Sequence, residues 1–220
     1  MKEYKYILLD LDGTITDPMI GITRCVEYAL NHFGIQVNDL RELCPFIGPP
    51  LKDSFREFYG FSNEQAETAL IKYREYFSKK GIFENQVYDG IPALLTQQKK
   101  SGRKLMLTTS KPEIFARQIL DYFNLSHYFS FIGGATLGGK RSTKTDVIQY
   151  VLKSNKIENP SDVIMIGDRK HDIEGAQTND MQSIGALYGY GSEKELYEAG
   201  ANIIVPSVTH LQNLLNTIIY

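Results

Sequence analysis

The sequence contains no tryptophan, only four histidines and only two cysteines, Cys25 and Cys44, among its 220 residues. Two cysteines cannot build a disulfide framework, and neither has a His or Cys neighbour at the spacing of a zinc site. No apolar run approaches the roughly 20 residues that span a bilayer, and the N-terminal residues lead directly into a first apolar segment. We therefore expect buried thiols, no targeting or membrane-spanning segment, and a location in the reducing cytoplasm.

The chain also lacks an excess of either charge, because 24 Lys and Arg residues nearly balance 26 Asp and Glu residues and leave a net charge of −2. This balance provides no attraction for nucleic acid or for an anionic membrane, so neither is an expected partner. A hydrophobic content of 42% and a charged content of 23% are typical of a globular protein. The length allows one large domain or a main domain with a smaller insert.

The spacing of apolar residues changes along the chain, which indicates two domains. From residue 16 to about 85 they recur at helical spacing, and no segment there has the pattern of a strand. The rest of the chain alternates apolar runs with amphipathic stretches, the pattern of a parallel sheet covered by helices. The sequence thus predicts an α/β protein with a Rossmann-like parallel sheet core, residues 1–15 and 86–220, and an inserted all-helical cap domain, residues 16–85.

The predicted strands of the core lie at residues 6–9, 104–109, 128–132, 163–167, 183–188 and 202–205. The predicted helices between them lie at about 91–101, 113–122, 143–155, 172–179, 193–199 and 207–217. Ligands bind at the carboxyl ends of the strands in such sheets, so we expect functional side chains in the loops that follow the strands.

The first predicted strand ends in two carboxylates, since the apolar residues 6–9 lead into Asp10 and Asp12, followed by Gly13 and Thr14. An uninterrupted apolar run indicates a strand buried on both faces, whose polar end lies where ligands collect. Gly13 permits a tight turn that lets both carboxyl groups approach one ligand, and Thr14 adds a hydroxyl and an N–H. A string of Asp-x-Asp-Gly alone is equally a surface turn, but after this strand it favours a site for a divalent metal and an anion.

Two further segments carry groups that suit an anion. Thr108, Thr109 and Ser110 end the second core strand with three hydroxyls, although this segment taken alone favours a cap for the next helix. Lys144 lies at the start of a predicted helix, where its charge opposes the helix dipole. That placement is explained either by an anionic partner or by solvation on an exposed helix.

A later strand, residues 163–167, again ends in acid, with Asp168 and Asp172 spaced as one turn of a helix. A turn followed by a helix N-cap explains Asp172 without a site, but explains Asp168 less well. All four polar segments follow predicted strands in order, so they converge on one edge of the predicted sheet.

In this order the motifs resemble those of the haloacid dehalogenase superfamily over essentially the whole chain. The string DLDGT at residues 10–14 matches its first motif, and Gly167, Asp168 and Asp172 match its fourth, GDxxxD. Residues 169–171 between the last two acids are variable positions of that motif, and no catalytic role is assigned to His171.

The second and third motifs of the superfamily are a strand end in Thr or Ser and a lysine. Thr109 fits the second motif best because Ser-Lys-Pro follows it, with Thr108 as the alternative. Lys144 fits the third motif, with Lys140 as the alternative.

The resemblance implies a mechanism of phosphoryl transfer with a covalent intermediate. Asp10 would attack phosphorus to give an aspartyl-phosphate, while Asp12 would protonate the leaving alcohol and then deprotonate the attacking water. Thr109 and Lys144 would hold the remaining phosphate oxygens.

The resemblance also implies Mg²⁺ as cofactor, bound by Asp10, the backbone carbonyl of Asp12 and Asp168, with Asp172 binding it directly or through a water molecule. Further substrate contacts are predicted for residues beside the phosphate and in the cap: Gly13, Thr14, Thr108, Ser110, Phe46 and Gly48.

The cap contacts lie in the segment CPFIGPPL, residues 44–51, which we expect to set substrate specificity. Gly48 and the two prolines after it predict a rigid exposed turn. Phe46 or Ile47 would then offer an apolar contact to the leaving group, although Phe46 is equally expected in the core of the cap.

Asp12 favours a phosphatase, because the dehalogenases of the superfamily lack this second acid. The strings FIGPPLKDSF, TSKP, GDRKHDIEGA and YGYGSEKEL resemble phosphoglycolate-phosphatase-like proteins described as 5′-nucleotidases, which implies a nucleoside monophosphate as substrate. Phosphoglycolate phosphatase and β-phosphoglucomutase-like phosphomutase are the alternatives within the superfamily.

Two alternatives are not enzymes. A phospho-accepting signalling domain uses similar side chains on a parallel sheet, but it needs a much shorter chain and has no role for the helical insert. A catalytically silent partner-binding protein is disfavoured because every side chain that the reaction requires is present.

Overall fold

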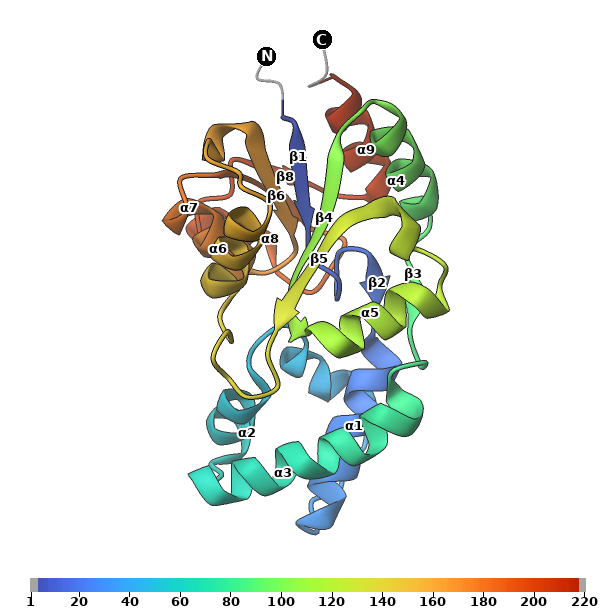
Figure 1. Ribbon diagram of the computed structural model, residues 1–220. Helices are drawn as coiled ribbons and strands as arrows, with labels where there is room; N and C mark the ends of the chain where they lie inside the picture. Colours follow the sequence, from blue (N-terminus) through green and yellow to red (C-terminus); the bar gives the residue numbers. More distant parts are fainter. Residues whose placement is uncertain (1–3, 218–220) are drawn as a thin grey trace. The chain divides into compact units, whose positions relative to one another are not determined.

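The computed structural model describes residues 4–217, which belong to two compact units (Figure 1). The first unit combines Met1–Thr16 with Val87–Tyr220, and the second is Asp17–Gln86. The connecting segments β2 (Thr16–Asp17) and β3 (Gln86–Val87) pair with each other. Within residues 4–217, no helix combines the length and the apolar character needed to cross a membrane.

A sheet of six parallel strands forms the centre of the first unit, in the order β5-β4-β1-β6-β7-β8. Its strands are β1 (Tyr6–Leu9), β4 (Lys104–Pro112), β5 (Phe129–Ala135), β6 (Val163–Gly167), β7 (Gln182–Ala186) and β8 (Ile203–Val205). The chain runs outward from β1 to β5 on one side and then from β6 to β8 on the other. The carboxyl ends of β1, β4 and β6 therefore meet where ligands bind in open parallel sheets.

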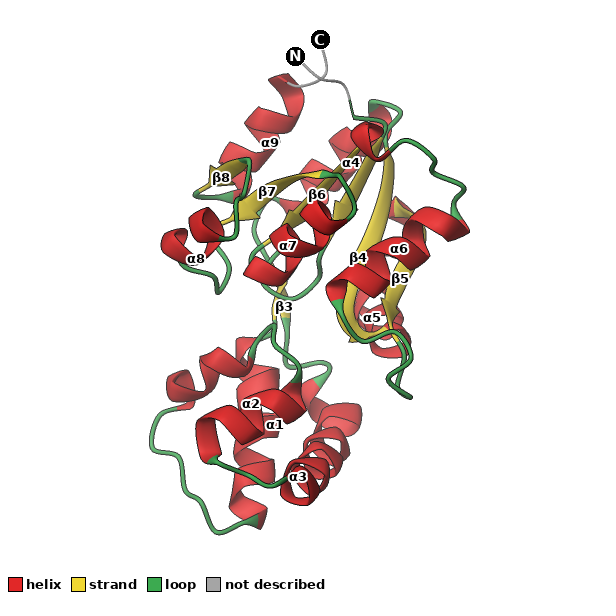
Figure 2. Ribbon diagram, turned by 90° about the vertical axis from the view of Figure 1, so that its left-hand side faces the viewer, coloured by secondary structure: helices red, strands yellow, loops and turns green. Residues whose placement is uncertain are grey.

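Helices cover both faces of this sheet, as Figures 1 and 2 show. Helices α6 (Lys144–Ser154), α7 (Lys170–Thr178) and α8 (Glu193–Glu198) lie on one face, and α4 (Ile91–Lys100), α5 (Glu113–Tyr122) and α9 (Val208–Thr217) lie on the other. Short 3₁₀ turns, η3 (Ser126–Tyr128) and η4 (Pro160–Asp162), precede β5 and β6. The predicted α/β fold with a parallel sheet is confirmed.

Strand β1 is a continuous run of apolar residues because it lies at the centre of the core of the first unit. Ile7, Leu8 and Leu9 are fully buried because helices cover both sides of this central strand. Leu8 packs with Met106 of β4 in the cluster that includes the buried residues of α6. Every second residue of these strands therefore faces α6. The same alternation decides on which face of the sheet the residues that end each strand lie.

Two strands extend beyond their predicted ends. β4 continues past residue 109 to Pro112, and β5 continues to Ala135 through Gly133 and Gly134. The pairing of the two strands shifts register between Thr109 and Pro112. Periodicity did not reveal this irregular segment, because only pairing with a neighbouring strand keeps it extended.

The second unit is helical, with α1 (Met19–His32), the 3₁₀ helix η1 (Leu40–Phe46), α2 (Leu51–Tyr59), α3 (Asn63–Tyr76) and the π-helical turn η2 (Phe77–Gly81). The predicted capping box at the start of α3 is present, because Ser62 and Gln65 satisfy each other's backbone N–H groups. Gly60 ends α2 in the left-handed conformation at φ +66°.

Candidate active site

Three carboxylates meet at the carboxyl ends of the central strands in the first unit. Asp10 follows β1, Asp168 follows β6, and Asp172 lies in the first turn of α7. One oxygen from each lies within 4.8 Å of the others, and the residues are 8%, 0% and 1% exposed. We call these three residues the acid cluster. The three side chains predicted to bind metal are thus brought together, whereas the predicted ligand from Asp12 is its backbone carbonyl, which stays a prediction.

Lys144 is the cation of this cluster. Its Nζ lies 2.8 Å from Asp10 Oδ1 and 2.7 Å from Asp172 Oδ1. Burial disfavours the ammonium, but these two carboxylates outweigh that effect and raise the pKa of Lys144. Lys144, the first residue of α6, is therefore paired with anionic groups. Of the two explanations that the sequence offered for a lysine here, an anionic partner and solvation, the structure supports the first.

The charges of the cluster do not balance. Burial raises the pKa of Asp168 well above its ordinary value, and the carboxylates of Asp172 and Asp10 raise it further. Burial also raises the pKa of Asp172 to about 6, a rise that Lys144 opposes and Asp10 reinforces. Three carboxylates face one ammonium, and a divalent cation would remove the excess negative charge. Hard oxygen ligands of this kind suit Mg²⁺, so the residues present fit the metal.

The turn after Asp12 lies against the acid cluster. Gly13 has φ +81°, and a Cβ atom at this position would overlap the carboxylate of Asp168. Thr14 is fully buried, and its hydroxyl lies 3.5 Å from Asp168 Oδ1. The tight turn expected at Gly13 is therefore present, and it brings the loop after β1 into contact with Asp168, which follows β6.

Asp12 has different surroundings from the acid cluster. Its Oδ2 accepts a hydrogen bond from Nζ of Lys111, and the two side chains are 12% and 7% exposed. Burial raises the pKa of Asp12, although Lys111 opposes this rise. The sequence interpretation did not assign Lys111 a role, because nothing local to Ser-Lys-Pro shows that the irregular end of β4 turns this lysine toward Asp12.

The structure also bears on the choice between Thr108 and Thr109. Leu8 pairs with Met106 in register, and both pack toward α6. Since strand residues alternate between faces, Thr108 lies on the same face as Met106, whereas Thr109 lies on the opposite face. Nζ of Lys144 donates to the backbone carbonyl of Thr108 over 3.0 Å.

The hydroxyl groups agree with this assignment. Within residues 4–217, Oγ1 of Thr108 is buried without a hydrogen-bond partner, as a group awaiting a ligand would be. Oγ1 of Thr109 already accepts a hydrogen bond from the backbone N–H of Lys111 over 3.2 Å. The unpartnered hydroxyl and the face of the strand favour Thr108, the alternative from the sequence, while the O–H of Thr109 can still donate to an anion, so the assignment of Thr109 stays a prediction. Ser110 follows in the half-buried end of β4.

The two predicted contacts of the helical unit differ in exposure. Phe46 is 2% exposed, and its ring packs against Phe55, Phe58 and Tyr59 within 6.0 Å between centroids. Its ring thus belongs to the core of this unit, and we correct the prediction that it contacts substrate. Gly48 is exposed with φ +106°, which agrees with the expected turn.

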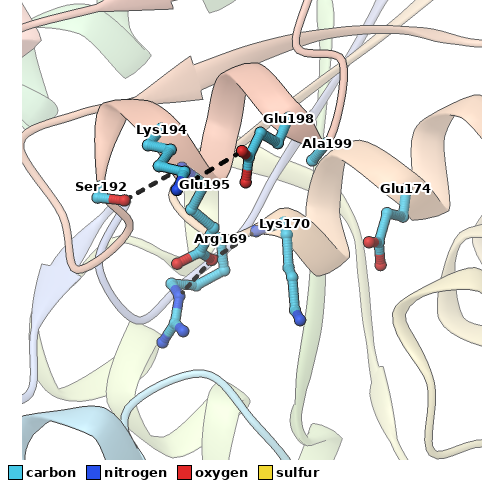
Figure 3. Close-up of a pocket in the computed structure, with 8 residues that line it drawn as sticks. All are labelled: Arg169, Lys170, Glu174, Ser192, Lys194, Glu195, Glu198 and Ala199. Atoms are coloured by element: carbon cyan, nitrogen blue, oxygen red, sulfur yellow. Dashed lines mark hydrogen bonds and ion pairs between the residues drawn. The ribbon is translucent and has the colours of Figure 1, made fainter.

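A pocket of about 440 Å³ lies between α7 and α8, and Arg169, the residue after Asp168, is among those that line it (Figure 3). Acidic and basic side chains alternate around it, and Nε of Arg169 lies 2.9 Å from Oε1 of Glu195. The same Glu195 oxygen accepts from the backbone N–H of Lys170 over 2.9 Å. Arg169, which sequence analysis treated as variable, therefore ties the start of α7 to α8.

This site belongs to a known family. Residues 7–186 match the family model described as haloacid dehalogenase-like hydrolase. A protein of Pseudomonas aeruginosa named 5′-nucleotidase is 46% identical over 193 residues, which cover 88% of this chain and 87% of that protein. A crystal structure of "a predicted phosphatase from Clostridium acetobutylicum" is 52% identical, with a TM-score of 0.95 over 98% of this chain and 100% of that one.

More distant relatives carry other names. The tyrosine-protein kinase PtkA of Mycobacterium tuberculosis is 34% identical over 92% of this chain and 69% of its own length. Phosphoglycolate phosphatase 1 of Pseudomonas aeruginosa is 27% identical over 94% of this chain and 78% of its own length. The chain therefore belongs to the haloacid dehalogenase-like hydrolase family, among its phosphatases.

Proposed function

We propose that this phosphatase is a Mg²⁺-dependent 5′-nucleotidase that hydrolyses nucleoside monophosphates through an aspartyl-phosphate on Asp10. The observation that carries the mechanism is the placement of Lys144 between Asp10 and Asp172, with the hydroxyl of Thr108 free beside them. The 46% identity to a protein named 5′-nucleotidase supports the substrate class.

In the first step Asp10 is the nucleophile. A carboxylate oxygen forms a bond to phosphorus while the bond from phosphorus to the ester oxygen breaks. Lys144 holds the attacking carboxylate in place, because its Nζ lies 2.8 Å from Asp10 Oδ1. Lys144 and Thr108 then offer donors to the phosphoryl oxygens, whose charge must be balanced during transfer.

Asp12 is the proton donor and acceptor. Its protonated form gives a proton to the departing ester oxygen, and its carboxylate then takes a proton from the water that cleaves the aspartyl-phosphate. Burial raises the pKa of Asp12 and so favours the acid form, while Lys111 favours the base form. These opposing effects on its pKa suit Asp12 to serve first as an acid and then as a base.

The metal is assigned to the acid cluster. Asp10 and Asp168 would bind Mg²⁺ with the backbone carbonyl of Asp12, and Asp172 would bind it directly or through water. When bound, Mg²⁺ neutralises charge that accumulates on the phosphoryl group. We further propose that the exposed turn at Gly48 in the helical unit contributes to substrate choice. We also propose a cytoplasmic location, because two cysteines cannot build a disulfide framework.

The test is phosphate release with Mg²⁺ from a panel of nucleoside monophosphates, phosphoglycolate, pyrophosphate and sugar phosphates, with Asp10→Asn as the blank. Preference for nucleotides supports the proposal. Preference for phosphoglycolate would leave the proposed mechanism in place and change only the substrate. Phosphoglycolate is the second candidate because a relative of 27% identity is named phosphoglycolate phosphatase 1. A nucleoside triphosphate with a tyrosine-containing protein completes the panel, because one relative is named a tyrosine-protein kinase.

A further inference from the structure

The segment that follows β7 contacts the acid cluster. It contains Tyr188, Gly189, Tyr190 and Gly191, which sequence analysis used only for a resemblance. The backbone N–H of Tyr190 donates to Oδ2 of Asp168 over 2.8 Å. Asp168 is fully buried, and with the Thr14 hydroxyl at its Oδ1 this bond to Oδ2 fixes the orientation of the carboxylate.

The two glycines of this segment allow it to approach Asp168 closely. A Cβ atom on Gly189 would overlap the Cβ of Asp168 and the backbone oxygen of Gly13, and one on Gly191 would overlap the backbone oxygen of Asp168. Neither glycine has a positive φ, so a turn does not explain them. They are needed because any side chain would displace Asp168 or the loop after β1.

Tyr188 connects this segment to the loop after β1. Its hydroxyl donates to the backbone carbonyl of Thr14 over 3.1 Å. Its ring lies edge-on to Tyr88, with centroids 5.3 Å apart and an angle of 77°. Burial raises the pKa of the Tyr188 phenol, so the group remains a neutral donor. Asp168 is thus enclosed between two loops that one hydroxyl holds together.

We propose that Tyr188 is a positioning residue for the metal-binding carboxylate of Asp168, acting through the segment Gly189–Gly191 and the loop at Thr14. The hydroxyl of Tyr188 would keep the two loops at the separation that holds the carboxylate of Asp168 in its orientation within the acid cluster. This inference rests on the Mg²⁺ site of the proposed function. Groups that hold a metal ligand in place typically change metal affinity by about 10–100-fold when they are removed.

The test is calorimetric titration of the whole protein with Mg²⁺ alone, for wild type, Tyr188→Phe and Gly189→Ala. We expect Tyr188→Phe to raise the Mg²⁺ dissociation constant about tenfold, and Gly189→Ala to raise it by up to about 100-fold. The increase in unfolding temperature at a fixed Mg²⁺ concentration should shrink in the same order, because ligand stabilisation depends on affinity. Neither readout depends on catalysis.

Two matched variants serve as controls. Tyr197→Phe removes a hydroxyl from a residue that is 77% exposed, and Gly138→Ala adds a methyl group where nothing lies within 4 Å. Both should bind Mg²⁺ as the wild type does. If Gly189→Ala fails to fold, Tyr188→Phe alone decides, since it removes one oxygen and leaves the packing of the ring.

A dissociation constant for Tyr188→Phe within twofold of wild type, or an equal loss in Tyr197→Phe, would overturn the inference and leave the proposed function intact. Absence of Mg²⁺ binding by the wild type would instead overturn the metal assignment itself, together with the inference. The wild-type titration therefore separates the two failures.

Discussion

Two buried lysines at the same end of the sheet have carboxylate partners, but the two groups differ in charge balance. Lys144 lies between Asp10 and Asp172 with Asp168 close by, so carboxylates outnumber ammonium groups. Lys111 pairs with Asp12, which lies outside the acid cluster. The first arrangement calls for a further cation, whereas in the second a lysine faces the carboxylate of Asp12.

This difference indicates a division of labour. The excess of carboxylates in the acid cluster offers oxygen ligands to a metal, while Lys144 bonds to Asp10 within it. In the second group burial raises the pKa of Asp12 while Lys111 opposes the rise, which suits a carboxylate that must gain and lose a proton. The same residue types therefore support phosphoryl transfer in one group and proton transfer in the other.

Asp10→Asn should break the first group most completely. The change removes the nucleophile with little change of shape, so turnover should fall by up to about 10⁶-fold while the fold is retained. Brief reaction with substrate carrying labelled phosphate, followed by acid quenching, should label the wild type and not the variant. Substantial turnover by Asp10→Asn would remove the covalent mechanism.

Asp168→Ala should lower activity by at least about 10²-fold and abolish saturable dependence on Mg²⁺, because a metal ligand is lost. The measurement is activity across a Mg²⁺ titration. An unchanged titration curve would show that Asp168 is not a ligand. Asp12 belongs to the other group, so Asp12→Asn should lower activity without this loss of metal dependence.

Without metal, the acid cluster should make the free energy of unfolding depend on pH. The folded pKa of Asp172 is about 6 against an ordinary value of 3.8, so the folded state holds a proton that the unfolded state releases. This contribution is fully present below pH 3.8 and is lost as pH rises through about 6.

Denaturant unfolding of wild type and Asp172→Asn across this pH range measures the contribution as a difference between the two proteins. The wild type should lose stability relative to the variant as pH rises, and saturating Mg²⁺ should reverse the trend because metal replaces the proton. A difference that stays constant with pH would contradict the raised pKa of Asp172.

Thr108→Val and Thr109→Val compare two faces of the same strand. We expect loss of the Thr108 hydroxyl to reduce kcat/KM by about 10–100-fold, the effect of one hydrogen bond to a charged group. Thr109→Val should have the smaller effect, because Thr109 lies on the face of β4 opposite to Met106 and α6. The reverse order would restore the original assignment of Thr109.

Lys111→Met tests the second group, and its effect should depend on the leaving group. An alkyl phosphate needs proton transfer from Asp12 and should react about tenfold more slowly, whereas an aryl phosphate with an acidic leaving group should be less affected. The control is Lys194→Met, since this side chain is 81% exposed. Equal losses on both substrates would show that Lys111 does not act through Asp12.

Much of the fold could be predicted because local patterns agree with it. The apolar run of β1 reflects burial on both faces, and the capping box at Ser62 and Gln65 satisfies backbone groups within one turn. Helix α5 was predicted at its observed bounds, Glu113–Tyr122. The irregular end of β4 was missed because a neighbouring strand determines it.

For the candidate site, the chain order of Asp10, Lys144, Asp168 and Asp172 at strand ends and helix starts was enough to identify the residues that converge. These positions follow from the topology of a parallel sheet, whose carboxyl ends share one edge. The amino-acid sequence by itself therefore determined the class of fold and the charged groups available for chemistry.

Only the tertiary structure decided how those groups are paired. The face on which Thr108 lies depends on strand register, and the partner of Asp12 depends on the register shift that turns Lys111 toward it. The contact of Tyr190 with Asp168 joins residues from separate loops. Such pairings connect positions far apart in the chain and leave no periodic signal, so they emerge only when packing brings the segments together.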